Sequence, residues 1–176
     1  MVIKRLLTAL WLTPLAIMVV WFGDMYLLCF VATLGLIAVL EFFRMAEGVK
    51  AKPLTIFGVI FTVLIILIRE PNIQDYVNKY YDFNLLLPTL LTTGVILSLI
   101  LLLLRKQKFG VFPGWAWTWA GIFYTGWLLG FIVSLRFLDD GRNWLYLALF
   151  CTFASDTFAF FIGRAIGKHK MSPGIS

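Results

Sequence analysis

One carboxylate lies deep within an apolar stretch of this sequence. Asp156 stands between Cys151 and Gly163, where every neighbour is apolar, small or a hydroxyl residue. An ionised side chain at such a depth in a membrane costs a few kcal/mol, and it normally faces a bundle interior or a water-filled cavity. The adjacent hydroxyl of Thr157 is suited either to bond this carboxylate or to contact a substrate. The sequence therefore predicts a functional carboxylate, with a purely structural, hydrogen-bonded Asp156 as the alternative.

Basic residues follow this carboxylate at the end of the same stretch. Arg164 comes first, and Lys168, His169 and Lys170 come shortly after it. At ~1.5 Å per helical residue, Asp156 lies about 10 Å before the end of the apolar stretch. The simpler interpretation is a basic cluster that anchors a membrane helix. The alternative joins a carboxylate for a cation with bases for phosphates, the pairing that phosphoryl-transfer sites use.

Small residues recur at every fourth position of the same segment. They are Ser155, Ala159, Gly163 and Gly167. Such a stripe lets the backbone of a second helix come close. We therefore expect this segment to be a helix that packs against a neighbour.

The composition indicates which kind of element must hold these residues. Of the 176 residues, 61% are hydrophobic and 14% are charged, and the mean hydropathy is +0.93. Soluble domains have about 45–50% apolar and about 25% charged residues, and a chain this short cannot hide so much apolar surface from water. This excludes a soluble globular enzyme, a disordered segment and a disulfide scaffold. The net charge of +6 does not indicate a nucleic-acid partner, because the bases occur in short clusters beside apolar runs.

Six apolar runs predict an all-α, polytopic transmembrane helix bundle in a single domain. Each run approaches the ~20 residues that cross ~30 Å of hydrocarbon, and the third is the shortest. A transmembrane barrel would alternate apolar and polar residues, which these runs do not do. The seven tryptophans mostly lie near the ends of the runs, as interface anchors do. The predicted spans are 6–23, 25–43, 53–68, 84–104, 115–135 and 143–163.

The basic residues predict the orientation of these spans. If the N-terminus is cytoplasmic, the inner segments carry eleven Lys and Arg residues and the outer loops carry four. Short loops rich in Lys and Arg stay in the cytoplasm. Both the N- and C-termini are therefore predicted to be cytoplasmic. The four outer bases are Arg69, Lys79, Arg136 and Arg142.

One string combines most of the residues introduced above. It reads Asp156-Thr157-x-Ala159-Phe160-x-x-Gly163-Arg164-x-x-Gly167-Lys168-His169-Lys170-Met171-Ser172-Pro173. This string resembles the bacterial phosphatidate cytidylyltransferase family, also called CDP-diglyceride synthase. The opening Lys4-Arg5-Leu6-Leu7-Thr8-Ala9, with Pro14 in the first span, looks like the start of that family. The likeness is tight over about twenty residues, and elsewhere it is one of hydropathy and span order.

The resemblance implies a reaction at the cytoplasmic leaflet of the cell (inner) membrane. An oxygen of phosphatidic acid attacks the α-phosphorus of CTP, which gives CDP-diacylglycerol and pyrophosphate. Two anionic reactants imply a divalent cation, usually Mg²⁺. By resemblance, Asp156 is the catalytic residue and metal ligand, and Thr157 lines the polar cavity. Lys168, His169 and Lys170 would bind phosphates. A homodimer is left open.

The resemblance also implies a C-terminal signature rich in Lys, Arg, His and Asp, which carries much of the family's metal and phosphate site. The sequence stops at Ser176, before that signature. We therefore expect a truncated member or fragment with little or no CTP turnover by itself. Two other classes stay open. One is a non-catalytic membrane module that binds lipid or helices, and the other is a small transporter that uses Asp156 as a proton or ion site.

Overall fold

The computed structural model describes residues 2–105 and 110–166, and all the regular structure within these ranges is helical. The chain forms eight α-helices and one π-helical turn over this part. Their bounds are α1 Val2–Phe22, α2 Asp24–Gly48, α3 Thr55–Leu67, α4 Pro71–Asn78, α5 Phe83–Leu103, α6 Val111–Gly121, η1 Ile122–Trp127, α7 Leu128–Arg136 and α8 Gly141–Ile166. The all-α class predicted from the sequence is confirmed.

Four helices in the described ranges are long and apolar enough to cross a membrane. They are α2, α5, the continuous helix Val111–Arg136 that joins α6, η1 and α7, and Gly141–Gly163 of α8. These helices coincide with the predicted spans 25–43, 84–104, 115–135 and 143–163, with ends that differ by a few residues. The chain is therefore a multi-pass membrane protein.

The predicted third span, 53–68, is too short and is followed by a sharp bend. With 13 residues, α3 is about 20 Å long, against about 30 Å of hydrocarbon. A break then turns the chain by 89° into α4. Glu70 caps α4 by accepting the Ile73 N–H at 2.9 Å, and Pro71 occupies the first turn. α1, with 21 residues, has the length of a span. Beside α1, the described ranges thus hold four helices that are long and apolar enough to span a membrane, or five if α3 and α4 form one broken span.

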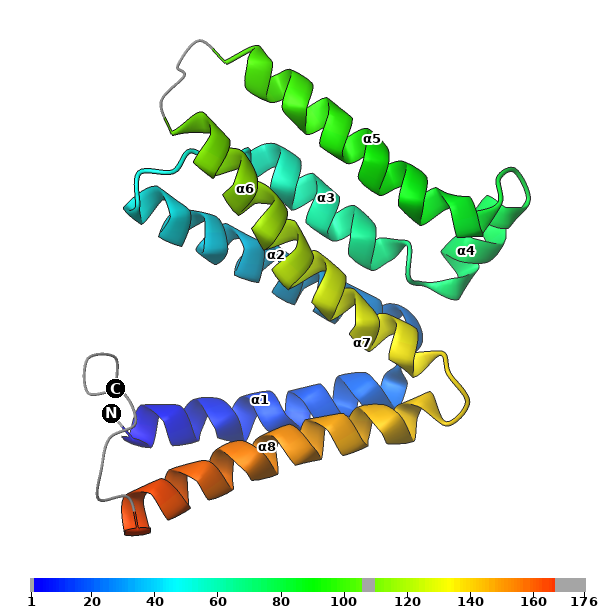
Figure 1. The fold of residues 1–176 in the computed structure, drawn as a ribbon. Helices are drawn as coiled ribbons and strands as arrows, with labels where there is room; N and C mark the ends of the chain where they lie inside the picture. The colour runs from blue at the N-terminus through cyan, green and yellow to red at the C-terminus, as the bar shows by residue number, and fades with distance from the viewer. Residues whose placement is uncertain (1, 106–109, 167–176) are drawn as a thin grey trace.

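The helices form two groups that meet at an angle (Figure 1). In one group, α2, α3 and the α6–η1–α7 helix pack together, and α5 lies on the outside beside α3 and α6. In the other, α1 and α8 run antiparallel. The first turn of α1 and the last turn of α8 lie at the same end of the structure.

Two clusters of buried apolar side chains hold these groups together. The first joins α1, α2, α3, α7 and α8, with Val20, Leu28, Ile66, Val133 and Leu145 among its members. The second joins α3 to α6 and η1. Its members are Leu54, Phe57, Phe61, Ile65, Trp119 and Ile122. Both clusters contain residues of α3, so this short helix is the central packing element.

The helix Val111–Arg136 contains a π-helical turn that the sequence analysis does not predict. Thr125 and Gly126 of η1 are buried against α3. A Cβ placed on Gly126 would lie 3.0 Å from the Cα of Thr62, so glycine permits this close approach. The turn widens the helix locally without ending it.

A hydrogen-bonded clasp attaches α5 to α6. The buried hydroxyl of Ser98 accepts the indole N–H of Trp115 at 2.9 Å and that of Trp119 at 3.0 Å, and it donates to the carbonyl of Val95 at 2.9 Å. Trp119 is buried, so it serves packing between helices. This differs from the interface role that its position in the sequence suggests.

Candidate active site on helix α8

A tight reversal sets the start of the helix that carries Asp156. Asp140 adopts the left-handed conformation with φ of 56°, and its carbonyl accepts the N–H groups of Asn143 and Trp144 at 2.8 and 3.2 Å. The next residue must be glycine, because a Cβ on Gly141 would lie 2.3 Å from the carbonyl oxygens of Leu135 and Arg136. This geometry fixes α8 relative to α7.

The first half of α8 is attached to α1. The hydroxyl of Tyr146 donates to the carbonyl of Ile17 at 3.2 Å, and the guanidinium of Arg142 lies 4.8 Å from the centre of the Trp21 ring. Leu145 is buried among residues of α1, α2 and α7. The second half differs, because every residue from Cys151 to Gly163 is exposed.

Asp156 continues a helix face whose earlier members line a cavity. Leu145, Leu149 and Thr152 border a cavity of about 240 Å³ with residues of α1 and α2. Asp156 follows Thr152 by four residues and Leu149 by seven, spacings that place them on one side of a helix. The carboxylate therefore lies one turn beyond the cavity, on the face of α8 that the cavity occupies.

The carboxylate of Asp156 is exposed and makes no hydrogen bond or ion pair with the described residues. A buried structural aspartate would have its acceptor oxygens bonded to donors of the same fold, whereas an exposed carboxylate does not need such partners. This arrangement leaves the carboxylate available to a ligand or to groups from outside the described part of the chain. A functional role for Asp156 stays a prediction.

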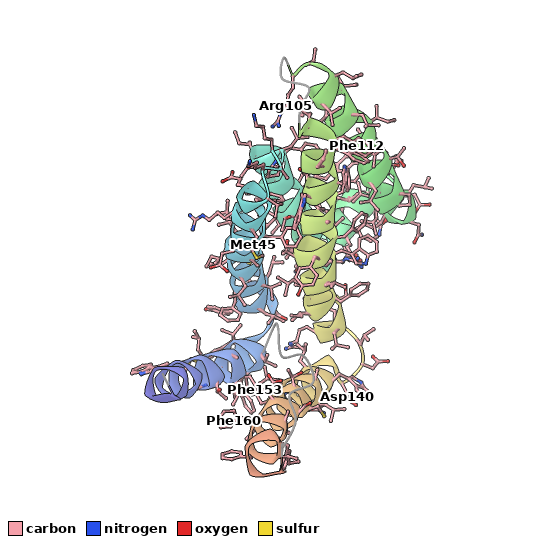
Figure 2. The ribbon with its side chains drawn as sticks, turned by 60° about the vertical axis from the view of Figure 1, so that its left-hand side comes forward. Met45, Arg105, Phe112, Asp140, Phe153 and Phe160 are labelled. Atoms are coloured by element: carbon pink, nitrogen blue, oxygen red, sulfur yellow. The ribbon has the colours of Figure 1, made fainter. Side chains whose placement is uncertain are left out.

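The structure describes some of the other predicted site residues and not others. Thr157 is exposed beside Asp156. Lys168, His169 and Lys170 lie outside the described residues. At Gly163 of the small-residue stripe, an added Cβ would have no neighbour within 4 Å among the described residues. Figure 2 labels Phe153 and Phe160, on either side of Asp156 in the sequence, along this open helix.

Asp156 fits a divalent cation only as one member of a ligand set. Within the described ranges, no group of three or more His, Cys, Asp or Glu side chains is close enough to hold a metal. Protein-bound Mg²⁺ commonly takes one or two carboxylates and completes its shell with water and substrate phosphates. A single unpaired carboxylate is consistent with that mode of binding. The remaining ligands would come from substrate, water or residues beyond the described ranges.

A half-buried arginine at the end of α3 is a feature that the sequence analysis does not predict. The guanidinium of Arg69 lies 4.9 Å from the Trp127 ring centre and 4.8 Å from that of Phe131. Its Nε and Nη2 atoms are buried without a hydrogen-bond partner in the described structure. Loop position and charge alone assign Arg69 to an outer loop. Its aromatic cage comes from η1 and α7, more than fifty residues away, and no local pattern reveals it.

Known proteins resemble this chain over nearly its whole length. Three relatives named phosphatidate cytidylyltransferase come from Staphylococcus haemolyticus, Staphylococcus saprophyticus and Staphylococcus epidermidis. They are 29%, 31% and 28% identical to this chain over 173, 175 and 172 residues, which is 98% of the chain in each case. The chain spans 62% of the length of these relatives. No solved structure matches it.

The match to a family of proteins is broader than the short string around Asp156. The family model described as the cytidylyltransferase family covers residues 3–176. It therefore includes both helix groups, the basic loops and the whole of α8. The chain belongs to the cytidylyltransferase family.

Proposed function

We propose that this chain takes part in the transfer of a cytidylyl group from CTP to phosphatidic acid, which yields CDP-diacylglycerol and pyrophosphate. The observation that carries this proposal is the family match over residues 3–176, together with relatives named for this activity that align with 98% of the chain. The exposed carboxylate of Asp156, which has no partner among the described residues, lies on a membrane-spanning helix and is consistent with it. The reaction belongs to phospholipid synthesis, in which a lipid substrate never leaves the membrane.

The proposed reaction forms one P–O bond and breaks another. An oxygen of the phosphatidic acid phosphate attacks the α-phosphorus of CTP, and the bond to the oxygen that bridges the α- and β-phosphorus breaks, so that pyrophosphate leaves. Both reactants are anions, so their approach requires positive charge. Asp156 would bind or orient a divalent cation such as Mg²⁺, which when bound neutralises part of the phosphate charge. Thr157 would line the site, and Lys168, His169 and Lys170 would bind phosphates.

We place the reaction at the cytoplasmic face of the inner membrane, with both termini on that side. The excess of Lys and Arg in the inner segments supports this orientation. The first turn of α1 and the last turn of α8 also share one end of the structure. A second copy of the chain stays a predicted partner, and the exposed face of α8 is where additional protein would complete the site.

The test is the transfer of label from CTP, radiolabelled at the α-phosphorus, into chloroform-soluble lipid in vesicles that contain phosphatidic acid. Two proteins are compared. One is this chain alone, and the other is a hybrid in which it replaces the matched 62% of the Staphylococcus saprophyticus relative. We expect labelled lipid from the hybrid, in an amount that depends on phosphatidic acid, and little or none from the chain alone.

The controls separate the proposed activity from its alternatives. Substituting diacylglycerol for phosphatidic acid should abolish labelling, because the attacking phosphate oxygen is then missing. No labelled lipid from either protein, with both inserted in the membrane and melting cooperatively, would contradict the proposal. Uptake of an ion into sealed vesicles in place of lipid labelling would support a transporter.

A further inference from the structure

A basic hollow lies where the ends of three helices meet, away from α8. It has a volume of about 710 Å³, and it lies between the end of α2, the start of α3 and the end of α5. Figure 2 labels Arg105 at this end of the structure. Three cationic side chains face one carboxylate in its lining. The lining residues are Glu47, Lys50, Ala51, Lys52, Pro53 and Arg105.

The guanidinium of Arg105 is held in place by the backbone on the far side of the hollow. It donates from Nη1 to the carbonyl of Lys52 at 2.8 Å and from Nη2 to the carbonyl of Pro53 at 3.3 Å. Its other N–H groups make no hydrogen bond to the described residues, and none of them is buried. A fixed arginine with donors to spare is suited to bind a phosphate oxygen.

The segment that carries the two lysines is also fixed by its backbone. The N–H of Lys52 donates to the carbonyl of Gly110 at 3.4 Å, and the N–H of Leu54 donates to the hydroxyl of Thr118 at 2.8 Å. Gly114 packs directly on this segment, since a Cβ there would lie 2.1 Å from the Lys52 carbonyl oxygen. The hollow is therefore formed by the fold rather than by a loose loop.

An apolar groove begins at the edge of the hollow. It has a volume of about 490 Å³ and shares Pro53 and Arg105 with the basic lining. From there it follows α3 along Ile56, Phe57 and Ile60, with Leu101 of α5 also in its lining. The side chains of Ile56 and Ile60 are 79% and 53% exposed. Positive charge and apolar surface thus adjoin at one end of the membrane-spanning bundle.

We propose that the hollow and groove together bind one anionic phospholipid. Its phosphate lies between Lys50 and Arg105, and an acyl chain follows the groove along α3. The excess of positive charge matches a phosphate headgroup, and basic pockets between transmembrane helices on the cytoplasmic side recognise such headgroups. An acyl chain bound in the groove then covers its apolar side chains with hydrocarbon. This site is formed by α2, α3 and α5, so it is separate from Asp156 and does not depend on the proposed activity.

The test measures lipid bound to the full chain in a neutral detergent by native mass spectrometry. Dioleoyl phosphatidate is titrated against the wild-type chain and two charge-reversal variants. We expect one lipid to bind with highest affinity, and Lys50→Glu to weaken it by roughly tenfold or more. Lys79→Glu makes the same change of charge at the end of α4, outside the site, and should leave the affinity unchanged. Equal weakening by both variants, or none by Lys50→Glu, would overturn the proposal.

A second comparison tests the groove. Ile60→Gln should weaken binding of the dioleoyl lipid several-fold, whereas Ile96→Gln, at an exposed position of α5 outside the groove, should not. Inorganic phosphate should displace the lipid only at far higher concentration, because it lacks the acyl chain. Phosphate that competes as well as the lipid would mean that the site binds a free anion, and the proposal would fail. Thermal melting checks that each variant is folded, and Lys50→Gln supplies a milder charge variant.

Discussion

Two membrane-spanning helices of similar length have opposite surroundings. In the helix Val111–Arg136, 44% of the most apolar 18-residue stretch is buried inside the protein. In the helix Gly141–Gly163, only 6% of the corresponding stretch is buried. The first helix packs on α2, α3 and α5, and its buried hydroxyls at Thr118 and Thr125 are hydrogen-bonded. Among the described residues, the contacts of the second helix with α1 and α7 lie in its first half. This helix carries the one carboxylate that lies deep in a predicted span.

The contrast separates two physical requirements. A helix that stabilises the bundle needs close contacts and satisfied polar groups, as Ser98 and the two tryptophans of α6 provide for α5. A helix that carries a reactive group needs an accessible side chain instead. The carboxylate of Asp156 has that accessibility. Helix α8 is attached to α1 through Tyr146 and Arg142, and these contacts leave the surroundings of Asp156 open. Substitutions in the two helices should therefore have different effects.

The largest expected effect is on activity, from Asp156→Asn in the hybrid enzyme. If Asp156 helps to stabilise the charge of the reacting phosphates as proposed, its loss should lower kcat by about 10²–10³-fold, as the loss of one electrostatic group does in other active sites. The melting temperature should stay the same, because this side chain has no partner among the described residues. Label transfer from CTP to lipid measures the effect. Asp139→Asn, in the exposed turn before α8, is the matched control and should keep full activity.

The largest expected effect on stability comes from Gly114→Ala at the start of the packed helix. The added Cβ would meet the Lys52 backbone at 2.1 Å, so the helix must shift, at a cost of about 1–3 kcal/mol. Gly163→Ala adds the same methyl group where no atom of the described residues lies within 4 Å, and it should not destabilise the protein. Thermal unfolding in detergent compares the two variants. Equal losses would mean that the open face of α8 is in fact covered.

A similar but smaller loss is expected from Ser98→Ala. This change leaves two indole N–H groups without their acceptor, of which that of Trp119 is buried, and it should cost about 1–2 kcal/mol. Thr92→Ala, on the same helix, removes an exposed hydroxyl that bonds only to the carbonyl of Pro88. Its unfolding midpoint should match that of the wild type, and a larger loss there than at Ser98 would refute the clasp.

The smallest effect is expected from Tyr146→Phe, which removes the hydrogen bond from α8 to the carbonyl of Ile17. The bond is half-buried and 3.2 Å long, so its loss should cost about 0.5–1 kcal/mol. The readout is faster hydrogen exchange at the amides of α8, with that of α6 unaffected. Exchange that rises equally in both helices would mean that the two groups of helices unfold as one unit.

The sequence predicts long helices well and tertiary arrangements poorly. Hydropathy alone places α2, α5, α8 and the helix Val111–Arg136 within a few residues, because a run of about 20 apolar residues has few other stable forms in lipid. The bend after α3 is not predicted, since the apolar run ends at a length that fits either a short span or a core helix. The apolar residues around Asp156 in the sequence also predict that it lies in a helix and deep within a span.

The partners of a site depend on contacts between distant residues, which no local pattern contains. Arg105 and Lys52 are separated by 53 positions, so charge counting assigns both to inner loops without placing them in one hollow. The cage of Arg69 and the Ser98 clasp arise in the same way. The exposure of Asp156 also depends on tertiary structure, because the stripe of small residues beside it predicts a packed helix.

One side-by-side measurement tests most directly whether Asp156 of α8 serves the reaction and the hydrogen bonds of Ser98 to α6 serve stability. The hybrid enzymes with Asp156→Asn and with Ser98→Ala are compared for label transfer per mole of folded protein and for melting temperature. We predict that Asp156→Asn lowers transfer by about 10²-fold or more with an unchanged melting temperature, while Ser98→Ala lowers the melting temperature and keeps transfer per folded molecule. Normal transfer by the Asp156→Asn variant, or a loss of transfer that only follows a loss of folding, would contradict the account.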